Sequence, residues 1–362
     1  MNLVFVIWSA PFFGGMERRY TRLADSIANS NKEHDVFIFV QRRCAETVYD
    51  FLPEKTKLKV VEFGRKEYKR GFFGLMLELL SFRRKVANAL PNNVHVVANP
   101  GALATILSYL SPLKSSISLS MVDSTYEKNS TRVKRVIAYF GLLRCKRVDC
   151  LSQETFEKFN YYFGDRQAAK ARVAPCSFSD YSSTDLGGGP RDIDVVCMAR
   201  FVEDKGYDLI EKIEPYLNDF NVHLCGFGPR RFGFDGTRFN IYQTKDPLSV
   251  LSRGKIFLSI QRGTNYPSQA ALEAMYCGCA IIATDVGETR KLLDESCAVM
   301  IPYNAESLKK AIKMLMADPA LRNRLGRKAK QRALGFHTVE RYRDYFMEKV
   351  VGNDNPYHNR LK

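Results

Sequence analysis

The sequence predicts an α/β protein built from two Rossmann-like, doubly wound parallel sheets. Two observations predict this class. At 362 residues the chain exceeds what one hydrophobic core usually supports, so two domains are expected. Short apolar runs also alternate with stretches of helical periodicity, which is typical of βαβ units. We therefore expect two such domains facing each other across a central cleft.

The expected first domain spans residues 1–176, and its apolar runs predict seven strands, with helices over 16–29 and 130–143 among the connections. Those strands are 3–8, 34–40, 58–63, 94–99, 116–121, 147–152 and 171–175. Residues 177–192 are rich in Ser, Gly and Asp and are expected to form a linker.

The expected second domain spans residues 193–336 and contains six further strands, followed by helices from about Glu306 onward. Those strands are 193–199, 221–226, 239–243, 255–260, 280–285 and 298–302. Residues 337–362 are expected to form a C-terminal helix that packs back toward the first domain, and a tail.

The composition indicates which classes of partner the protein binds and in which cellular compartment it is found. Lys and Arg number 55 against 39 Asp and Glu, giving a net charge of +16, which favours phosphorylated substrates, anionic lipid headgroups or nucleic acid. The nine Cys form no CxxC or zinc-like spacing, as expected for reduced core thiols of a cytoplasmic protein. The N-terminal apolar run is too short for a signal peptide, and no stretch approaches the ~20 apolar residues of a membrane span.

Ligands of open α/β sheets bind beyond the carboxyl ends of the strands, so polar residues that follow a strand are the candidates for a site. Arg200 and Lys205 follow strand 193–199 at a strand–helix junction, which suits a diphosphate, or both are solvated surface residues. Gly226 and Gly228 follow the next strand, where they let backbone approach a ligand or form a plain Gly-Pro turn. No GxGxxG follows a strand, so a dinucleotide cofactor is not expected.

The stretch "NYPSQAALEAMYCG" follows strand 255–260 and predicts a helix with Pro267 in its first turn and Gly278 at its end. Gln269 and Glu273 then share one face with Tyr276. A buried carboxylate needs a partner, either a hydroxyl pair such as a ribose diol or an internal Arg or Lys.

In the first domain, Gly14 and Gly15 follow the first strand and open a helix whose amides could face an anion, or simply form a helix-start turn.

Together these features resemble the family-4 retaining glycosyltransferases, which have the two-Rossmann GT-B fold, over essentially the whole chain. The segments that carry the resemblance are "ARFVEDKG", which is similar to a G-R-x4-K-G diphosphate signature, "NYPSQAALEAMYCGCAIIATDVGETRKLL", similar to an E-x7-E helix with its following strand, the N-terminal "GGMERR" and the late "ADPALRNRLGRKAKQRA".

The resemblance implies roles for these residues. Arg200 and Lys205 would stabilise the departing nucleotide diphosphate, Glu273 would hold the ribose, and the amides near Ser268 and Gln269 would contact phosphate and sugar. Tyr266, Gly226 and Gly228 complete the expected donor-binding set, and Gly14 and Gly15 would lie between donor and acceptor. The implied mechanism passes the acceptor proton to the departing phosphate oxygen, so that neither a metal nor a cofactor is expected. "DID" at 192–194 enters a core strand and is not expected to bind metal.

Two positions depart from the family pattern. Asn265 stands where the family has its first Glu, so it joins the expected catalytic set while placing the donor and the activity in question. A His-Asp-like element is often found where this chain offers only Asp123. Of the five His residues, only His95 is expected on a cleft-facing strand, with Asp123 on the acceptor side.

The expected function is transfer of a hexose from a nucleotide-diphosphate sugar to a saccharide or lipid-linked acceptor, in the synthesis of a surface polysaccharide such as lipopolysaccharide. The basic, apolar segment 65–90 is either a membrane-surface element, placing the protein on the inner face of the cytoplasmic membrane, or an ordinary core-facing helix. The alternatives are a donor-binding protein without turnover, a sugar-nucleotide epimerase, which should show more catalytic carboxylates and His, and a nucleic-acid binder, for which no motif is found.

Overall fold

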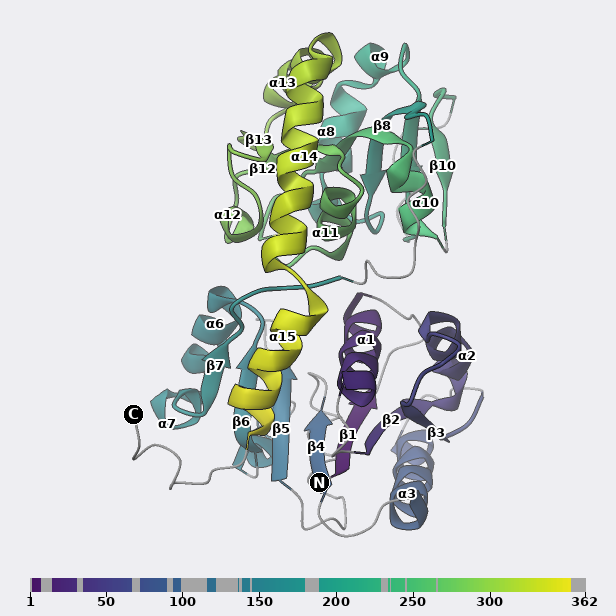
Figure 1. Ribbon diagram of the computed structural model, residues 1–362, viewed down its shortest axis with the longest axis vertical. Helices are drawn as coiled ribbons and strands as arrows, with labels where there is room; N and C mark the ends of the chain where they lie inside the picture. The colour runs from purple at the N-terminus through teal and green to yellow at the C-terminus, as the bar shows by residue number, and fades with distance from the viewer. Residues whose placement is uncertain are drawn as a thin grey trace. The chain divides into compact units, whose positions relative to one another are not determined.

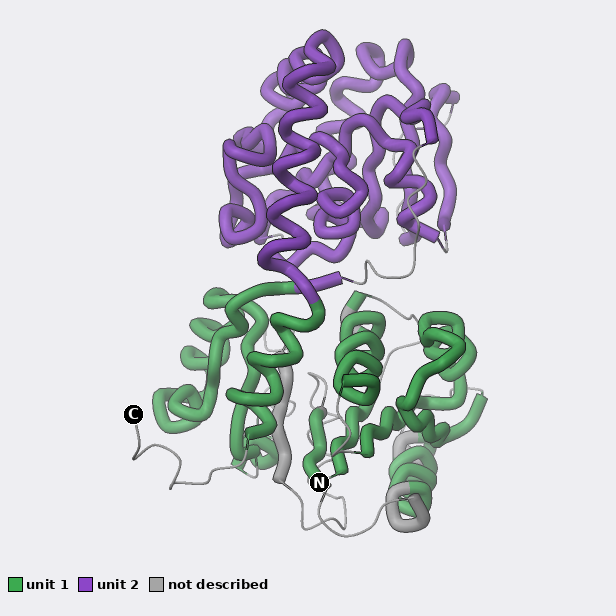
Figure 2. The backbone as a smooth tube through the Cα atoms, in the orientation of Figure 1, with its two compact units in different colours: residues 1–177, 339–362 green, residues 178–338 purple. Residues whose placement is uncertain are grey.

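The chain divides into two compact units, residues Met1–Ser177 with Val339–Lys362, and residues Phe178–Thr338 (Figure 2). The structure is a computed structural model that describes residues 2–7, 15–30, 35–66, 72–89, 94–98, 116–121, 136, 139–143, 145–179, 189–228, 234, 236–244, 246–264 and 266–352. Most of the expected linker, at 180–188, lies outside the described residues. We describe each unit by itself, as unit 1 and unit 2.

Unit 1 is built on a seven-stranded parallel sheet with the strand order β3-β2-β1-β4-β5-β6-β7 (Figure 1). The strands are β1 (Asn2–Ile7), β2 (Val36–Gln41), β3 (Lys59–Phe63), β4 (Val94–Ala98), β5 (Ser116–Met121), β6 (Cys145–Cys150) and β7 (Ala171–Val173). Each of the seven strands expected from the apolar runs is present, and the parallel α/β class is confirmed.

Helices cover both faces of this sheet because alternate side chains of each strand point to opposite sides. The helices are α1 (Gly15–Ser30), α2 (Arg42–Phe51), α3 (Phe72–Ala89), α6 (Gln153–Phe163), α7 (Asp165–Ala168), α15 (Val339–Tyr345) and the π-helical turn η2 (Phe346–Val351). Val4 and Val6 share one buried cluster with Phe82 of α3 and Phe159 of α6. On the other face Phe5 stacks on Phe346 of η2, with ring centroids 6.0 Å apart.

Unit 2 is built on a six-stranded parallel sheet with the order β10-β9-β8-β11-β12-β13. The strands are β8 (Ile193–Met198), β9 (Val222–Cys225), β10 (Asn240–Tyr242), β11 (Gly254–Ser259), β12 (Ala280–Thr284) and β13 (Ala298–Ile301). From β8 the chain proceeds to β9 and β10 on one side, and from β11 to β12 and β13 on the other. The strand order therefore reverses between β8 and β11, which is where doubly wound sheets bind ligands.

Two helical layers enclose the sheet of unit 2 (Figure 1). The helices are the 3₁₀ turn η1 (Glu203–Lys205), α8 (Tyr207–Lys212), α9 (Glu214–Leu217), α10 (Pro247–Ser252), α11 (Gln269–Tyr276), α12 (Thr289–Leu292), α13 (Ala305–Ala317) and α14 (Pro319–Phe336). Val196 and Phe257 pack with residues of α11 and α14, whereas Val195 and Leu258 pack with residues of α8 and α13.

The nine cysteines are all buried and free, as expected for reduced core thiols. Within the described residues, no helix combines the length and the apolar character that a membrane span requires.

Candidate functional site

Three loops of unit 2 carry most of the residues that the sequence nominates. Arg200 and Lys205 follow β8, Gly226 and Gly228 follow β9, and the segment from Tyr266 to Glu273 follows β11. Because all six strands are parallel, their carboxyl ends lie at the same edge of the sheet. The loops after β8 and β11 flank the point where the strand order reverses.

Lys205 bridges the two sides of this reversal. It ends the turn η1, and its Nζ donates a hydrogen bond of 2.7 Å to Oε1 of Gln261, which follows β11. The next residue, Gly206, has a φ of 72°, and a Cβ there would come within 2.6 Å of the Ile260 carbonyl oxygen. Glycine therefore lets the β8 loop pack directly against the end of β11, which puts Lys205 within reach of Gln261.

Gln261 is itself fixed by the neighbouring strand. Its backbone N–H donates to Oγ1 of Thr284 at 2.9 Å, and the same hydroxyl donates to the Gln261 carbonyl at 2.9 Å. Thr284 is fully buried at the end of β12, and Gln261 is 8% exposed. Three strands thus determine where the Lys205 ammonium lies. The sequence reading missed Gln261, although a polar residue directly after the apolar run "KIFLSI" was a usable signal.

The positive charges of Arg200 and Lys205 lie close enough to affect each other. Burial, and next the charge of Arg200, lower the pKa of Lys205, while Asp204 partly offsets the shift. Arg200 is exposed, and no described residue forms an ion pair or a side-chain hydrogen bond with its guanidinium. A bound anion would relieve the repulsion between the two cations, so this edge is electrostatically suited to a diphosphate.

Gly226 and Gly228 have a structural reason that the sequence reading did not foresee. A Cβ on Gly226 would lie 2.0 Å from the Ala199 carbonyl oxygen, and one on Gly228 would lie 2.6 Å from that of Phe201. The Phe201 N–H also donates to the Phe227 carbonyl at 2.8 Å. Both glycines therefore allow the β9 loop to pack on the backbone on either side of Arg200, so their direct neighbour is protein.

The helix after β11 begins two residues later than expected. Ser268 is the N-cap of α11, its Oγ accepting from the Ala271 N–H at 3.2 Å, so Pro267 precedes the helix rather than lying in its first turn. The expected helix end is confirmed, since Gly278 has a φ of 71° and follows the last turn. Gln269 and Glu273 both lie on α11, one turn apart, as expected.

Glu273 is buried at 2% exposure and accepts a 3.1 Å hydrogen bond from Oγ of Ser179 through its Oε1. One turn earlier, Nε2 of Gln269 donates to the Phe178 carbonyl at 2.7 Å. The polar face of α11 therefore holds the segment at 178–179, where unit 2 begins. The Ser179 hydroxyl is thus one partner of this buried carboxylate.

Tyr266 lies deeper than a donor-contacting side chain would require. It is 8% exposed and belongs to the core cluster formed with α11 and β12. The Lys291 ammonium lies 5.8 Å from the centre of its ring. The ring thus anchors the β11 loop in the core of unit 2.

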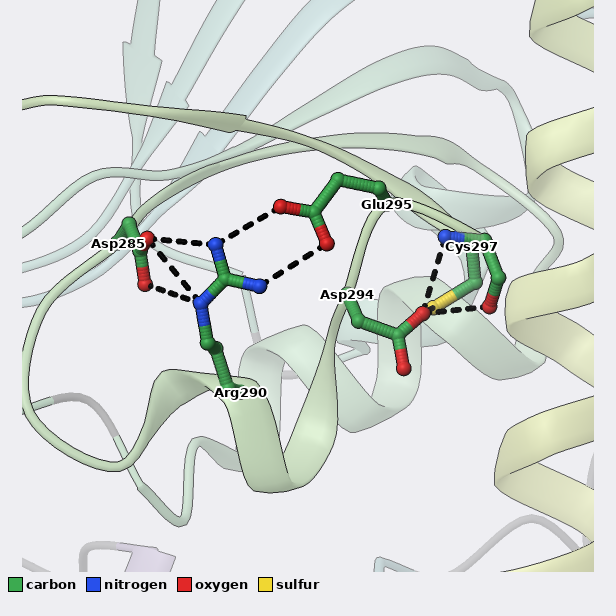
Figure 3. Close-up of polar contacts among 6 residues, drawn as sticks. Asp285, Arg290, Asp294, Glu295 and Cys297 are labelled. Carbon is green, nitrogen blue, oxygen red and sulfur yellow. Dashed lines mark hydrogen bonds and ion pairs between the residues drawn. The ribbon is translucent and has the colours of Figure 1, made fainter.

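The loop after β12 is tied by a charge network (Figure 3). Arg290 donates to both carboxylate oxygens of Asp285, at 2.7 to 3.1 Å, and to Glu295, at 2.8 and 2.9 Å. Within this loop, Gly287 has a φ of 51°, and a Cβ there would come within 2.7 Å of the Thr264 Cβ. The network therefore supports a loop that packs against the β11 loop.

The carboxylates of the "DID" stretch are occupied by protein cations. Asp194 pairs with Lys255 at 2.6 Å, and Asp192 forms two hydrogen bonds with the Arg253 guanidinium. That guanidinium holds the pKa of Asp192 near 2.

In unit 1, Gly15 is the exposed first residue of α1, whereas Gly14 and Asp123, like Asn265 of unit 2, lie outside the described residues.

The placement of His95 corrects an expectation. It is 3% exposed and lies near the start of β4, in register with Leu3 and Ser116, at the amino end of the sheet. Burial, with the charges of Lys146 and Arg147, lowers its pKa to about 4. Its position and its pKa both remove His95 from the candidate site.

Two parts of the sequence are similar to known proteins. Residues 207–348 match the family described as glycosyl transferase-like. A segment of 131 residues is 31% identical to one component of the human phosphatidylinositol N-acetylglucosaminyltransferase, a match that covers 32% of this chain and 27% of that protein. The chain therefore spans little more than a quarter of this relative's length.

Several solved structures share the fold over nearly the whole chain. HepE of Anabaena, in complex with UDP and glucose, superposes with a TM-score of 0.72 at 14% identity, covering 97% of this chain and 99% of that one. Sucrose-phosphate synthase of Thermosynechococcus elongatus gives 0.71 at 16% identity, covering 95% and 97%. A glycosyltransferase of Rickettsia africae gives 0.69 at 13% identity, covering 97% and 99%. The chain thus has the fold of the GT-B glycosyltransferases, as the resemblance implied, and its residues 207–348 carry the sequence pattern of the glycosyl transferase-like family.

Proposed function

We propose that the protein transfers a hexose from a uridine-diphosphate sugar to a saccharide or lipid-linked acceptor, with retention of configuration at the sugar. The observation that carries the proposal is the pair of cations at the strand reversal of unit 2, with Lys205 held by Gln261 and Arg200 exposed beside it. HepE, whose fold is shared, was solved with UDP, which supports uracil as the base of the donor.

In this mechanism the bond between the sugar and the diphosphate breaks, and a bond to an acceptor oxygen forms on the same face of the sugar. The departing phosphate oxygen takes the acceptor's proton, so the main requirement is to stabilise negative charge on the leaving group. Arg200 and Lys205 supply the positive charge that stabilises the leaving group, without a resident metal ion or cofactor. Removing preorganised donors of this kind commonly lowers kcat by about 10²–10³-fold.

Glu273 would accept hydrogen bonds from the ribose hydroxyls, with Ser179 orienting the carboxylate through its contact with Oε1. The backbone N–H groups at the start of α11, near Ser268 and Gln269, would donate hydrogen bonds to phosphate or sugar oxygens. Gly226 and Gly228 would act indirectly, by fixing the backbone around Arg200.

The acceptor, a place in surface polysaccharide synthesis and a cytoplasmic location belong to the proposal by resemblance alone. Asn265 motivates a second candidate, a protein that binds the donor without turnover. Detection of sugar transfer, or of donor hydrolysis above the uncatalysed rate, distinguishes the first candidate from the second.

Binding of UDP, GDP and uridine, measured by calorimetry and thermal shift, tests the site directly. UDP is expected to bind more tightly than GDP. Arg200→Ala and Lys205→Ala should each weaken UDP binding by roughly 10- to 150-fold, since a hydrogen bond to a charged group contributes about 1.5–3 kcal/mol. Both variants should leave uridine binding unchanged. Lys310→Ala on α13, an exposed cation elsewhere in unit 2, is the matched control. Absence of binding by any nucleotide would overturn the proposal.

A further inference from the structure

One face of unit 1 carries apolar side chains on its outer surface. The sheet face that bears Val4 and Val6 is covered by α3, by the helical residues 139–143 and by α6, since Phe82, Leu142 and Phe159 join the same buried cluster. Eight of the fourteen exposed large hydrophobic side chains among the described residues come from this layer and the helical residue 136 beside it. They are Met76, Leu77, Leu80, Val136, Tyr139, Phe140, Leu143 and Tyr161.

The outward side of α3 changes character along its length. Glu78 and Phe82 are buried, whereas Leu77 and Leu80 are 37% and 46% exposed. One to two turns further on, Arg84 and Lys85 are exposed on the same side. The helix therefore presents an apolar first half and a cationic second half, separated by about 10 Å at 1.5 Å per residue.

A hollow of about 700 Å³ lies where these two halves meet. It is lined by Leu77, Leu80, Ser81, Arg84 and Lys85 of α3, and by Val61, Gly64 and Arg65 at the end of β3. The Gly64 N–H donates to Ser81 Oγ at 2.9 Å, which holds the β3 end against the helix. The lining contains three cations and no carboxylate, and no described residue forms an ion pair with Arg65, Arg84 or Lys85.

A second exposed stripe lies in the same layer. Val136, Tyr139, Phe140 and Leu143 have the i, i+3, i+4, i+7 spacing of one helix side, and their exposed fractions run from 39% to 54%. Aliphatic and aromatic groups facing water cost free energy unless another apolar phase covers them. Nucleic acid would cover the cations, but it offers no apolar phase for Leu77 and Leu80.

We propose that this face of unit 1 docks on a bilayer containing anionic phospholipids, with a lipid phosphate in the hollow beside Arg65, Arg84 and Lys85 and with Leu77 and Leu80 inserted among the acyl chains. The order of the two halves of α3 matches a phospholipid, whose charged headgroup and apolar chains lie on opposite sides of the interface. This docking does not depend on the donor chemistry of unit 2.

Flotation with vesicles tests the proposal. The full chain should float with phosphatidylcholine vesicles containing phosphatidylglycerol and stay at the bottom with phosphatidylcholine alone. Two variants separate the two contributions: Arg84→Glu with Lys85→Glu, and Leu77→Gln with Leu80→Gln. The first should lower the partition coefficient at least about ten-fold, since every basic residue near an anionic surface contributes about a five-fold gain. The second should lower it at least about ten-fold as well, since two apolar side chains no longer enter the acyl chains.

The matched controls lie on α13 of unit 2, where Lys310→Glu with Lys313→Glu, and Met314→Gln, alter exposed residues of the same types. They should float like the wild type. Thermal unfolding and UDP binding, measured on every variant, establish that the units are folded and that the donor site is separate. Three outcomes would each overturn the proposal: no flotation of the wild type, equal losses in the α13 controls, or full retention of binding by the Leu77 and Leu80 variant.

Discussion

Lys205 and Gln261 join the two halves of the sheet of unit 2, through a hydrogen bond of 2.7 Å from the ammonium to the amide oxygen. Lys205 follows β8 and Gln261 follows β11, so the contact spans the reversal of strand order. A long, flexible lysine side chain would otherwise lose rotamer entropy when it binds a phosphate. Because of the pairing, this entropy is lost when the protein folds and not when the ligand binds, so the charge is preorganised.

Gln261→Leu should therefore weaken UDP binding without abolishing it. Leucine ends one atom earlier than glutamine and has no acceptor, so the ammonium loses one hydrogen bond and its fixed position. We expect a loss of roughly 3- to 10-fold in UDP affinity, equivalent to about 0.7–1.4 kcal/mol. Calorimetry measures it. In the Lys205→Ala background the same substitution should have little further effect, and additive losses would show that Gln261 acts independently of Lys205.

The lowered pKa of Lys205 predicts that UDP affinity decreases at alkaline pH. The ammonium deprotonates at a lower pH than an ordinary lysine, because burial and the charge of Arg200 disfavour the protonated form. UDP affinity should therefore be full at neutral pH and fall as the pH rises through this lowered pKa. Arg200→Ala should move the fall to higher pH, because it removes one cause of the shift. An unchanged midpoint in that variant would contradict the proximity of the two cations.

The contact between Ser179 and Glu273 predicts separable effects on stability and on binding. Ser179→Ala removes one hydrogen bond to a buried carboxylate, so it should lower the free energy of unfolding by about 1.5–3 kcal/mol. Glu273→Gln should instead lower uridine affinity about ten-fold while hardly changing the affinity for 2′,3′-dideoxyuridine. Equal losses for the two nucleosides would show that Glu273 does not contact the ribose.

The C-terminal helix α15 is tied to the sheet of unit 1 by a buried carboxylate. Asp149 of β6 is fully buried, and it accepts hydrogen bonds from the hydroxyls of Tyr342 and, at 2.9 Å, Tyr345. Tyr342 also packs against Phe346, with ring centroids 6.2 Å apart. These contacts attach residues after 339 to a sheet built from the first 177 residues.

Tyr342→Phe should lower the free energy of unfolding of unit 1 by about 1.5–3 kcal/mol, since it leaves a buried carboxylate with one hydrogen bond fewer. Tyr345→Phe should cost less, because Tyr345 is only half-buried and water can replace its hydroxyl. Urea denaturation measures both. The converse ranking would show that the Tyr345 hydroxyl contributes more to the stability of unit 1 than the Tyr342 hydroxyl does.

The strands were predictable because the core of a parallel sheet requires continuous apolar runs, such as "IDVVCMA" and "KIFLSI". The edge of the sheet that carries the candidate site was predictable from the same runs, since polar residues that follow a strand must lie at its carboxyl end. His95 was misplaced because it was nominated for lying on a strand at all. It is the second residue of β4, so its place in the apolar run already put it at the amino end of the sheet. Helix α2 was not among the predicted helices, because "RRCAETVYD" buries only a narrow stripe formed by Cys44, Ala45 and Val48.

The partners of Gln261 and Asp149 could not be predicted from the sequence, for a common reason. Their partners, Lys205 and Tyr342, lie 56 and 193 residues away along the chain, and no local pattern links residues at such separations. The glycines after β9 were predicted to let backbone approach a ligand, and their role for a ligand stays a prediction. In the structure the groups that approach them are the backbone of Ala199 and Phe201.

Asn265 offers the most direct test of turnover, because the family that the sequence resembles has Glu at this position. If position 265 has the role that this resemblance implies, a carboxylate there would add negative charge near the sugar, where positive charge develops in an oxocarbenium-like transition state. Asn265→Glu should therefore raise kcat with UDP-sugars, or shift the preference among them, while leaving UDP affinity within about two-fold. Asn265→Asp, with the same charge on a shorter side chain, is the matched control and should give a smaller gain. Loss of transfer in both variants would show that the neutral amide is itself part of the proposed donor site, and unchanged rates would show that position 265 does not contact the donor sugar.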